Sequence, residues 1–382
     1  MDNGIKCCAL CTVPITPDID SDEHVIPASI GGRWVVRGFI CKSCNDEGGL
    51  TSEAEISNRF GWFSLTAGIK RESGKKAPRP IIMKTDDGKK VLLKPNGVIE
   101  SWERTLEKIP TDDGRLLISG TRPSMNELRE MLSGLKRKHP DIDIESAIGN
   151  ARVEASYKPI THNFGGFGSD AFWRSVVKTV CAVAWSLELN EQDCEVAVNY
   201  LRKGEGKPFN LFYGRDVILN RPMDQLFHCV SLRSDNERNL LLGYVEYFGV
   251  FRGVVMLSDS YKGGDVDRTY AVDPVLGKEI DLTVDLHLSD QEVDQFQDGA
   301  ILNGENYLAA FEQSIAIALS LSEKSKLDMA INSAVDKVCN DMGIQSEQEI
   351  APEQALEFSR RIAEAMAPFF LDRIRAKHFT FD

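Results

Sequence analysis

Residues 7–45 read CCALCTVPITPDIDSDEHVIPASIGGRWVVRGFICKSCN, and this stretch decides the fold of the first part of the chain. It contains two CxxC pairs, Cys8 with Cys11 and Cys41 with Cys44. A CxxC turn presents two thiolates from one tight bend, and structural zinc takes four ligands in a tetrahedron. The spacing therefore predicts two knuckles that share one Zn²⁺ ion. Cys7 is an alternative to Cys8, because a CxxxC pair with Cys11 is also possible by spacing.

The distribution of the cysteines supports metal binding rather than disulfide bonding. Five of the nine cysteines fall in the first 44 residues, and the other four are scattered singly. The N-terminus lacks the apolar core of a signal peptide, and no apolar run reaches the ~18–20 residues that span a bilayer. We therefore expect a cytoplasmic protein with no membrane segment. Disulfides are rare in that compartment, so the clustered cysteines indicate a metal site.

A second set of functional groups lies between and just after the cysteine pairs. Glu23 and His24 precede a turn at Gly31-Gly32, and residues 34–40 (WVVRGFI) predict a strand that leads into the second pair. Asn45 follows that pair directly. An acid, a histidine and an amide are thus expected close to the zinc knuckles.

The charge of the chain is unevenly distributed. The net charge is −13, of which residues 1–58 carry −5, residues 59–94 carry +7 and the remainder carries −15. One basic segment beside the cysteine pairs suits a protein that contacts a polyanion at one place, although a solvated lysine-rich hairpin is the alternative. The side chains that we expect to bind nucleic acid are Lys70, Arg71, Lys75, Lys76, Arg79, Lys89 and Lys90.

The sequence predicts an α+β protein with three regions. Residues 1–66 form a small N-terminal zinc module. Residues 67–164 contain a basic linker, a β-hairpin around the Asp-Asp-Gly turn at 86–88, and a helix. Residues 165–382 form a larger α+β domain with a helical C-terminus, which we expect to have a sensing or regulatory role.

Periodicity predicts the main elements of the larger region. The run AFWRSVVKTVCAVAWSL at 171–187 predicts an apolar helix. Alternating apolar residues between 227 and 284 predict strands, and helical periodicity returns from about residue 305 to the end, with a last helix that begins at Pro352.

The layout of the first ~60 residues resembles the HNH endonucleases of the ββα-metal fold, in the branch with the pattern EHxIP…GG…CxxCN. The residues that carry the resemblance are Cys8, Cys11, Glu23, His24, Ile26, Pro27, Gly31, Gly32, Cys41, Cys44 and Asn45. The resemblance implies a metal-dependent enzyme that hydrolyses phosphodiester bonds of double-stranded DNA, by cutting or by nicking.

The resemblance also implies a role for each site residue. Glu23 and Asn45 hold a catalytic divalent ion, Mg²⁺ or Mn²⁺, and His24 is the general base that takes a proton from the attacking water. An imidazole suits this role near neutral pH. A hard, oxygen-ligated ion stabilises the charge that develops on the phosphate. The zinc ion on Cys8, Cys11, Cys41 and Cys44 is structural.

Two departures from the family pattern concern the base and the helix. The stretch Val35–Phe39 lacks the asparagine that steadies the base in many members, so the sequence does not show what orients His24. Gly48-Gly49 is expected to interrupt the helix after the second knuckle, because glycine is costly inside a helix. Ser52-Glu53-Ala54-Glu55 has the pattern of a capping box and predicts that a helix restarts there and continues to about Leu65. Glu53 or Glu55 could then supply a further ligand.

Other functions remain open at this point. A zinc-ribbon module that binds nucleic acid or protein without cleavage is the main alternative, although such a module does not need the Glu23-His24 pair. RNA is an alternative substrate. The resemblance also indicates bacterial antiphage defence, as in the HNH effectors of CBASS systems and the companion nuclease of type II Zorya systems. Residues 165–382 would then bind a small activating ligand or a partner protein of the defence system.

Overall fold

The computed structural model describes residues 6–70, 78–105, 107–112, 116–119, 125–137, 140, 143–149, 158–298, 303–345 and 348–378. Its contacts divide the chain into two compact units. The first contains Met1–Arg79 and Phe164–Leu321, and the second contains Pro80–Asn163 and Ser322–Asp382. These units differ from the predicted regions, because the N-terminal module shares a unit with most of residues 165–382 rather than standing alone.

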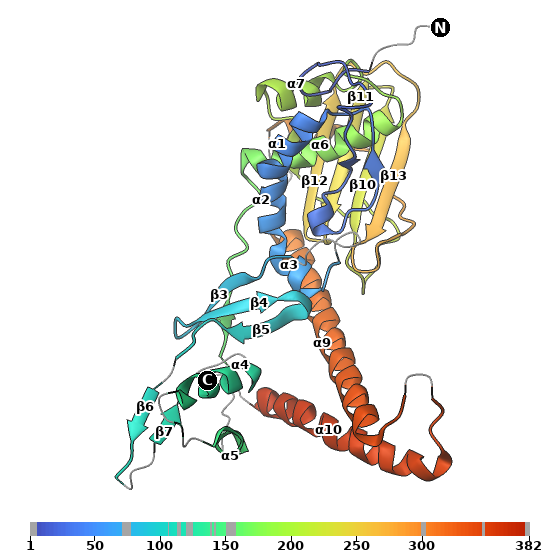
Figure 1. Ribbon diagram of the computed structural model, residues 1–382. Helices are drawn as coiled ribbons and strands as arrows, with labels where there is room; N and C mark the ends of the chain where they lie inside the picture. The colour runs from blue at the N-terminus through green and yellow to red at the C-terminus, as the bar shows by residue number, and fades with distance from the viewer. Residues whose placement is uncertain are drawn as a thin grey trace. The chain divides into compact units, whose positions relative to one another are not determined.

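A six-stranded antiparallel sheet forms the core of the first unit (Figure 1), with the strand order β14-β13-β10-β11-β12-β9. The bounds are β9 (Phe209–Leu211), β10 (His228–Asp235), β11 (Leu240–Tyr247), β12 (Phe251–Ser258), β13 (Asp267–Asp273) and β14 (Lys278–Glu279). Every residue of β11 and β12 is buried, so both faces of the central sheet are covered. The strands predicted between 227 and 284 are confirmed.

Helix α6 (Asp170–Ser186) lies against one face of this sheet, together with α7 (Glu195–Lys203). It is the apolar helix predicted at 171–187, and the Ser169 hydroxyl caps it by accepting a hydrogen bond from the backbone N–H of Phe172 at 3.2 Å. The helix approaches the sheet closely at Gly243 of β11, where a Cβ atom would lie 2.1 Å from a methyl of Val180. Glycine is required there because any larger residue would push α6 off the sheet.

The N-terminal module consists of a short hairpin and three helices. The bounds are β1 (Glu23–His24), the 3₁₀ turn η1 (Ala28–Ile30), β2 (Val35–Val36), α1 (Lys42–Leu50), α2 (Ser52–Arg59) and α3 (Gly61–Thr66). The strand predicted over 34–40 is therefore present only at Val35–Val36. The ββα arrangement that the resemblance implies is present.

The helix after the second knuckle differs from the prediction. Gly48 and Gly49 lie inside α1, and the break comes at Thr51, whose backbone angles are non-helical (φ −114°, ψ −82°). The capping box is not formed, since Ser52 is already the first residue of α2 and its hydroxyl donates to the carbonyl of Gly48 at 3.2 Å. Helix α2 nevertheless begins at Ser52, as expected.

Aromatic packing explains why the module and the sheet form one unit. Phe60, between α2 and α3, contacts Phe172 of α6 and Tyr247 of β11 at ring-centroid distances of 6.1 and 5.6 Å. Phe63 stacks on Phe248 at 5.4 Å. Phe248 is fully buried in the β11–β12 turn at a positive φ of 58°, a strained conformation for a bulky residue that this packing must stabilise.

The second unit contains small sheets and helices. Its strands are β3 (Ile81–Thr85), β4 (Lys90–Lys94), β5 (Val98–Ser101), β6 (Glu107–Pro110), β7 (Leu116–Ser119) and β8 (Ile160–Thr161). The predicted hairpin is β3–β4, and Gly88 takes the positive φ of 82° that its turn requires. A 3₁₀ turn, η2 (Pro95–Gly97), precedes β5.

Besides α6, α7 and the helices of the module, the described residues form five further α-helices. They are α4 (Met125–Lys136), α5 (Ile144–Gly149), α8 (Asp290–Asp298), α9 (Gly304–Met342) and α10 (Pro352–His378). The helical C-terminus and the helix start at Pro352 are confirmed. None of the helices in the described part of the chain combines the length and the apolar character that crossing a bilayer requires.

Candidate functional site

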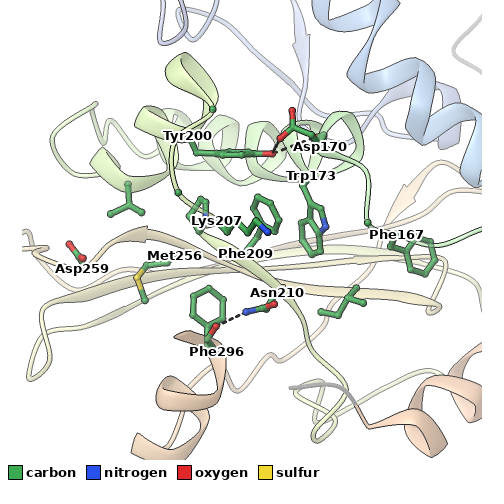
Figure 2. A pocket seen from close by; sticks show the side chains of 16 residues that line it. Phe167, Asp170, Trp173, Tyr200, Lys207, Phe209, Asn210, Met256, Asp259 and Phe296 are labelled. Carbon is green, nitrogen blue, oxygen red and sulfur yellow. Dashed lines mark hydrogen bonds between the residues drawn. The ribbon is translucent and has the colours of Figure 1, made fainter. Parts of the chain in front are cut away.

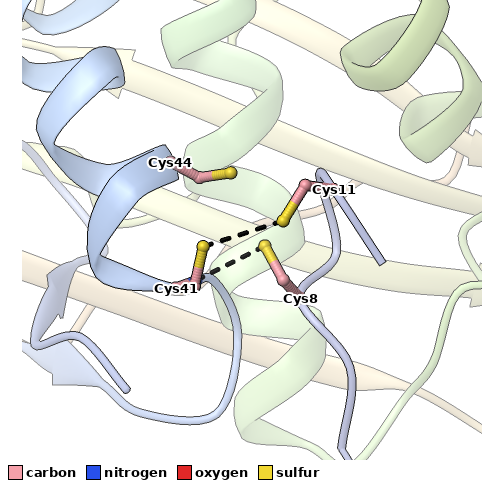
Figure 3. Close-up of side chains that lie close together, drawn as sticks. All are labelled: Cys8, Cys11, Cys41 and Cys44. Atoms are coloured by element: carbon pink, nitrogen blue, oxygen red, sulfur yellow. Dashed lines mark hydrogen bonds between the residues drawn. The ribbon is translucent and has the colours of Figure 1, made fainter. Parts of the chain in front are cut away.

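Four cysteine sulfurs converge at one end of the module (Figure 3). The Sγ atoms of Cys8, Cys11, Cys41 and Cys44 all lie within 4.8 Å of one another, and those of Cys11 and Cys41 are 3.7 Å apart. Four sulfurs at ~2.3 Å from one tetrahedral zinc ion would be about 3.8 Å apart. The cluster includes Cys8, which decides between the two alternatives that the spacing left open, and Cys7 lies outside it.

The electrostatics of the cluster also fit a metal ion. Burial opposes ionisation of Cys8, but backbone N–H groups, among them that of Cys41 at 3.4 Å, lower its pKa to about 7. Burial and the neighbouring thiols raise the pKa of Cys44 well above its usual value. Four thiolates so close together repel one another, and a divalent cation removes this penalty while it binds all four. The cluster is thus a zinc-knuckle site in its ligands and its geometry.

The hairpin places neighbouring residues on opposite faces. Strand β1 pairs with β2 in the register Glu23 with Val36 and His24 with Val35. Side chains alternate along a strand, so Glu23 points inward and is 1% exposed, whereas His24 is only half-buried. The pairing and the hydrogen bond from Val25 N–H to Trp34 O at 2.9 Å hold the backbone of His24 in place. The hairpin thus fixes the backbone position from which the His24 side chain extends.

Asn45 lies in the first turn of α1, next to the segment that enters β1. Its amide nitrogen is 3.5 Å from the backbone carbonyl oxygen of Asp22. Asp22 itself is exposed and pairs with Arg37 across the hairpin at 2.5 Å. The zinc cluster positions Asn45, because Cys41 is the N-cap of α1 and Cys44 precedes Asn45 directly.

A lysine from outside the module contacts the inward-pointing acid. The Nζ atom of Lys178, on α6, lies 2.6 Å from Oε1 of Glu23 and also pairs with Glu53 of α2. Lys178 is 5% exposed. A Cβ atom at Gly48 would lie 3.6 Å from the ammonium nitrogen, an ordinary van der Waals distance, so this turn of α1 lies directly beside the ion pair.

Burial and charge perturb both partners of this ion pair. Burial raises the pKa of Glu23 to about 7, while Lys178 lowers it and Glu53 raises it. Burial lowers the pKa of Lys178, but the two carboxylates outweigh this effect and raise it above its usual value. Lys178 is therefore a cation at every physiological pH.

The chemistry of the Glu23 carboxylate suits a hard divalent ion as well as an ammonium group. Oε2 of Glu23 is buried and has no hydrogen-bond partner among the described residues. A buried, unpartnered carboxylate oxygen is costly unless a cation or a donor can reach it. Carboxylate and amide oxygens are the ligands that Mg²⁺ and Mn²⁺ prefer, and Glu23 and Asn45 supply one of each.

Lys178 was not predicted from the sequence. Residues 175–184 of α6 are continuously buried, and Lys178 is the one charged residue among them. A lysine in such a run is rarely buried without an acidic partner. That rule indicates a buried ion pair, although it does not identify Glu23 and Glu53 as the partners.

The predicted nucleic-acid-binding residues are only partly described. Arg71, Lys75 and Lys76 lie outside the described residues. The side chains that are exposed are Lys70, Arg79, Lys89 and Lys90. Lys70 and Arg79 belong to the first unit, whereas Lys89 and Lys90 belong to the hairpin β3–β4 of the second.

The first unit also contains a cavity of about 900 Å³ beside α6 (Figure 2). On one wall Trp173 stacks on Phe209, with ring centroids 4.3 Å apart, and the Tyr200 hydroxyl donates to Asp170 at 2.7 Å. Lys207 adds a positive charge to the lining. Cavities of ~300–1,000 Å³ with an apolar wall and a few polar groups are typical of small-molecule sites.

Comparison with known families gives a match to the first part of the chain. Residues 8–61 match a family model described as HNH endonuclease. No curated protein and no solved structure matches the chain. The matched segment contains the four cysteines, Glu23, His24, Asn45 and Glu53, whereas Lys178 lies outside it.

Proposed function

Residues 8–61 form an HNH endonuclease domain of the zinc-knuckle branch, and from this premise we propose that the protein is a metal-dependent nuclease that hydrolyses phosphodiester bonds of double-stranded DNA. The observation that carries the proposal is the four-cysteine cluster inside the matched segment, which fixes α1 and its Asn45 beside the hairpin that bears Glu23 and His24.

Each site residue has a proposed role in this reaction. His24 accepts a proton from the attacking water, which an imidazole can do near neutral pH. Glu23 and Asn45 hold a Mg²⁺ or Mn²⁺ ion, which when bound would stabilise negative charge on the phosphate. The four cysteines bind zinc and keep α1, with Asn45, beside the hairpin.

The test is a plasmid assay with the purified, zinc-loaded protein. We expect conversion of supercoiled plasmid to nicked or linear form with Mg²⁺ or Mn²⁺, and none with EDTA in excess over the added metal. Cleavage of a structured RNA but not of the plasmid would replace DNA by RNA as the substrate. Binding to DNA without cleavage of either substrate would favour the zinc-ribbon binder.

We propose further that the exposed basic residues Lys70, Arg79, Lys89 and Lys90, with Arg71, Lys75 and Lys76, contact the phosphate backbone. Their support is the charge of +7 within residues 59–94 of a chain whose net charge is −13. Phosphate contacts supply most of the sequence-independent affinity for DNA, so a local basic segment is sufficient for this role.

For regulation, we propose that a small ligand binds in the cavity beside α6 and that the protein acts in bacterial antiphage defence. The support for regulation by a ligand is that one helix, α6, bears both Trp173 of the cavity wall and Lys178 of the ion pair with Glu23. A ligand that moves α6 would thus shift Lys178 and alter its ion pair with Glu23 in the hairpin. Ligand binding should change the fluorescence of Trp173 in the wild type and not in Trp173→Phe, and a defence role requires that His24→Ala abolish protection against phage in cells.

A further inference from the structure

We propose that the ammonium group of Lys178 repels the divalent ion that Glu23 binds. Lys178 thereby lowers the affinity of the HNH domain for this ion. The inference rests on the proposed function, because it takes Glu23 as a ligand of the ion. It adds a residue that the matched segment, residues 8–61, does not contain. We call Glu23, Glu53 and Lys178 the acid–lysine cluster.

Two of the three side chains in the acid–lysine cluster are closed to solvent. The side chains of Lys178 and Glu23 are 6% and 1% exposed, and that of Glu53 is 23% exposed. The three groups come from three elements, β1, α2 and α6, so no local sequence preference brings them together. Two carboxylates this close repel each other strongly in a poorly solvated place, and the ammonium group relieves that repulsion.

The geometry leaves one carboxylate oxygen unused. Oε1 of Glu23 contacts Lys178 at 2.6 Å, and Oε2 is buried without a hydrogen-bond partner among the described residues. A single ammonium contact engages one oxygen of a carboxylate, so the ion pair with Lys178 leaves Oε2 of Glu23 available. An ammonium that balances charge while one oxygen stays available for a second cation accounts for both observations.

Charge counting gives the direction of the effect. The cluster holds two carboxylates and one ammonium, and replacing the lysine by a neutral residue makes it more negative by one charge. A neighbouring ammonium group would repel a divalent cation held by Glu23 even where water screens the two charges, and an effect of about tenfold in affinity is expected. Removal of the lysine should therefore strengthen binding of the ion.

The experiment titrates Mn²⁺ into zinc-loaded, full-length protein and measures free Mn²⁺ by electron paramagnetic resonance. Lys178→Met keeps the length of the side chain and removes its charge, and we expect it to bind Mn²⁺ about tenfold more tightly than the wild type. Lys178→Arg keeps the charge and should bind Mn²⁺ with close to wild-type affinity. The double variant Lys178→Met/Glu53→Gln restores the formal charge of the cluster, so its affinity should return toward the wild-type value.

Thermal unfolding gives a second readout that does not depend on activity. Lys178→Met leaves two buried carboxylates without their cation, so its Tm should fall without Mn²⁺ and recover with it by more than the wild-type Tm rises. If Lys178→Met does not fold, the comparison of wild type with Glu53→Gln remains. Glu53→Gln removes negative charge beside the lysine and should weaken Mn²⁺ binding.

Two results would overturn the inference. Unchanged Mn²⁺ affinity in Lys178→Met would show that the lysine has only a structural role. Lost Mn²⁺ binding with zinc content and Tm retained would show that it positions the ligands rather than opposing the ion. The proposed function fails separately: in that case neither the wild type nor Lys178→Met binds Mn²⁺, and His24→Ala cleaves as fast as the wild type.

Discussion

The imidazole of His228, in the central strand β10, forms a hydrogen bond at 2.8 Å with the carbonyl oxygen of Ile30, in the turn that follows β1. The other ring nitrogen, Nδ1, accepts a hydrogen bond from the backbone N–H of Phe248 at 3.1 Å. Nδ1 is thus unprotonated, and Nε2 carries the proton that it donates to Ile30. One neutral histidine joins the sheet, the strained β11–β12 turn and the HNH module.

This histidine should make the stability of the first unit depend on pH. Burial lowers the pKa of His228 to about 4, from ~6.5 in an unfolded chain. Its contribution to stability is therefore present above about pH 6.5 and is lost as the pH falls toward 4, because the unfolded state then binds a proton that the folded state does not. The loss is about 3 kcal/mol if the histidine is the only group considered. Urea unfolding followed by tryptophan fluorescence suits the measurement, since four of the five tryptophans lie in the first unit.

The control for this prediction is His228→Gln, which cannot titrate. Glu23 has the opposite effect on the wild-type profile, because its raised pKa gives a contribution that is lost as the pH rises from ~4.5 to about 7. The wild type and His228→Gln both contain Glu23. The difference between their unfolding free energies therefore gives the contribution of His228 alone. That difference should shrink as the pH falls from 6.5 to 4. Parallel profiles across this interval would contradict the prediction.

Zinc removal should destabilise the whole first unit. Elemental analysis should give about one zinc per chain, and Cys41→Ser should lose it, because Cys41 is both a member of the cluster and the N-cap of α1. Since Phe60 and Phe63 pack on α6 and the β11–β12 turn, we expect the unfolding to extend to the sheet.

Cys7→Ser is the matched control for the zinc experiment. Cys7 lies next to Cys8 in the chain but outside the cluster, so this variant should keep both the zinc and the unfolding profile of the wild type. Zinc-free protein with a wild-type Tm, or zinc loss in Cys7→Ser alone, would show that the ligand set is wrong.

The zinc cluster and the main elements could be predicted because each depends on local signals. The CxxC spacing indicated the ligands of one site, although only the fold distinguished Cys8 from Cys7. The strands β10 to β12 and helix α6 followed from hydrophobic periodicity.

Long-range contacts could not be predicted in this way. Neither the pairing of Lys178 with Glu23 nor the stacking of Phe63 on Phe248 leaves a pattern in the neighbouring sequence, so the module was expected to stand alone. The break in α1 was placed at Gly48-Gly49 because propensity disfavours glycine in helices. In the structure α1 continues through both glycines to Leu50, because a cost of about 1 kcal/mol per glycine is a weak preference that the surrounding structure can override.

The basic segment should make DNA binding depend on salt. If the exposed residues contact phosphates, each charge removed lowers the log-log slope of affinity against salt by about 0.9 for duplex DNA. Replacing Lys70, Arg79, Lys89 and Lys90 by Gln should therefore reduce the slope by about 3.6 and weaken binding at low salt. Filter binding with a fixed duplex over a range of salt concentrations measures both.

A control that removes two charges, the same number as in each pair variant described below, separates contact from net charge. Lys262 and Lys278 are exposed lysines outside the basic segment, and replacing both by Gln should change the slope little. A fourfold variant with wild-type affinity and slope would show that the segment is a solvated surface. Testing the pair Lys70 and Arg79 separately from Lys89 and Lys90 then shows whether both units contribute.

Proton transfer and ion binding should be separable by mutation. If His24 is the general base, His24→Ala should retain zinc, fold and DNA affinity and lose about 10²–10⁴-fold in cleavage rate. If Asn45 is an ion ligand, Asn45→Ala should instead raise the Mn²⁺ concentration that gives half-maximal rate, and excess Mn²⁺ should restore part of the activity. Glu23→Gln should behave like Asn45→Ala, with a further loss of stability because Lys178 would lose a buried partner. Single-turnover rates over a Mn²⁺ titration distinguish the two patterns, and a His24→Ala protein that excess metal restores would assign the imidazole to the ion rather than to the proton.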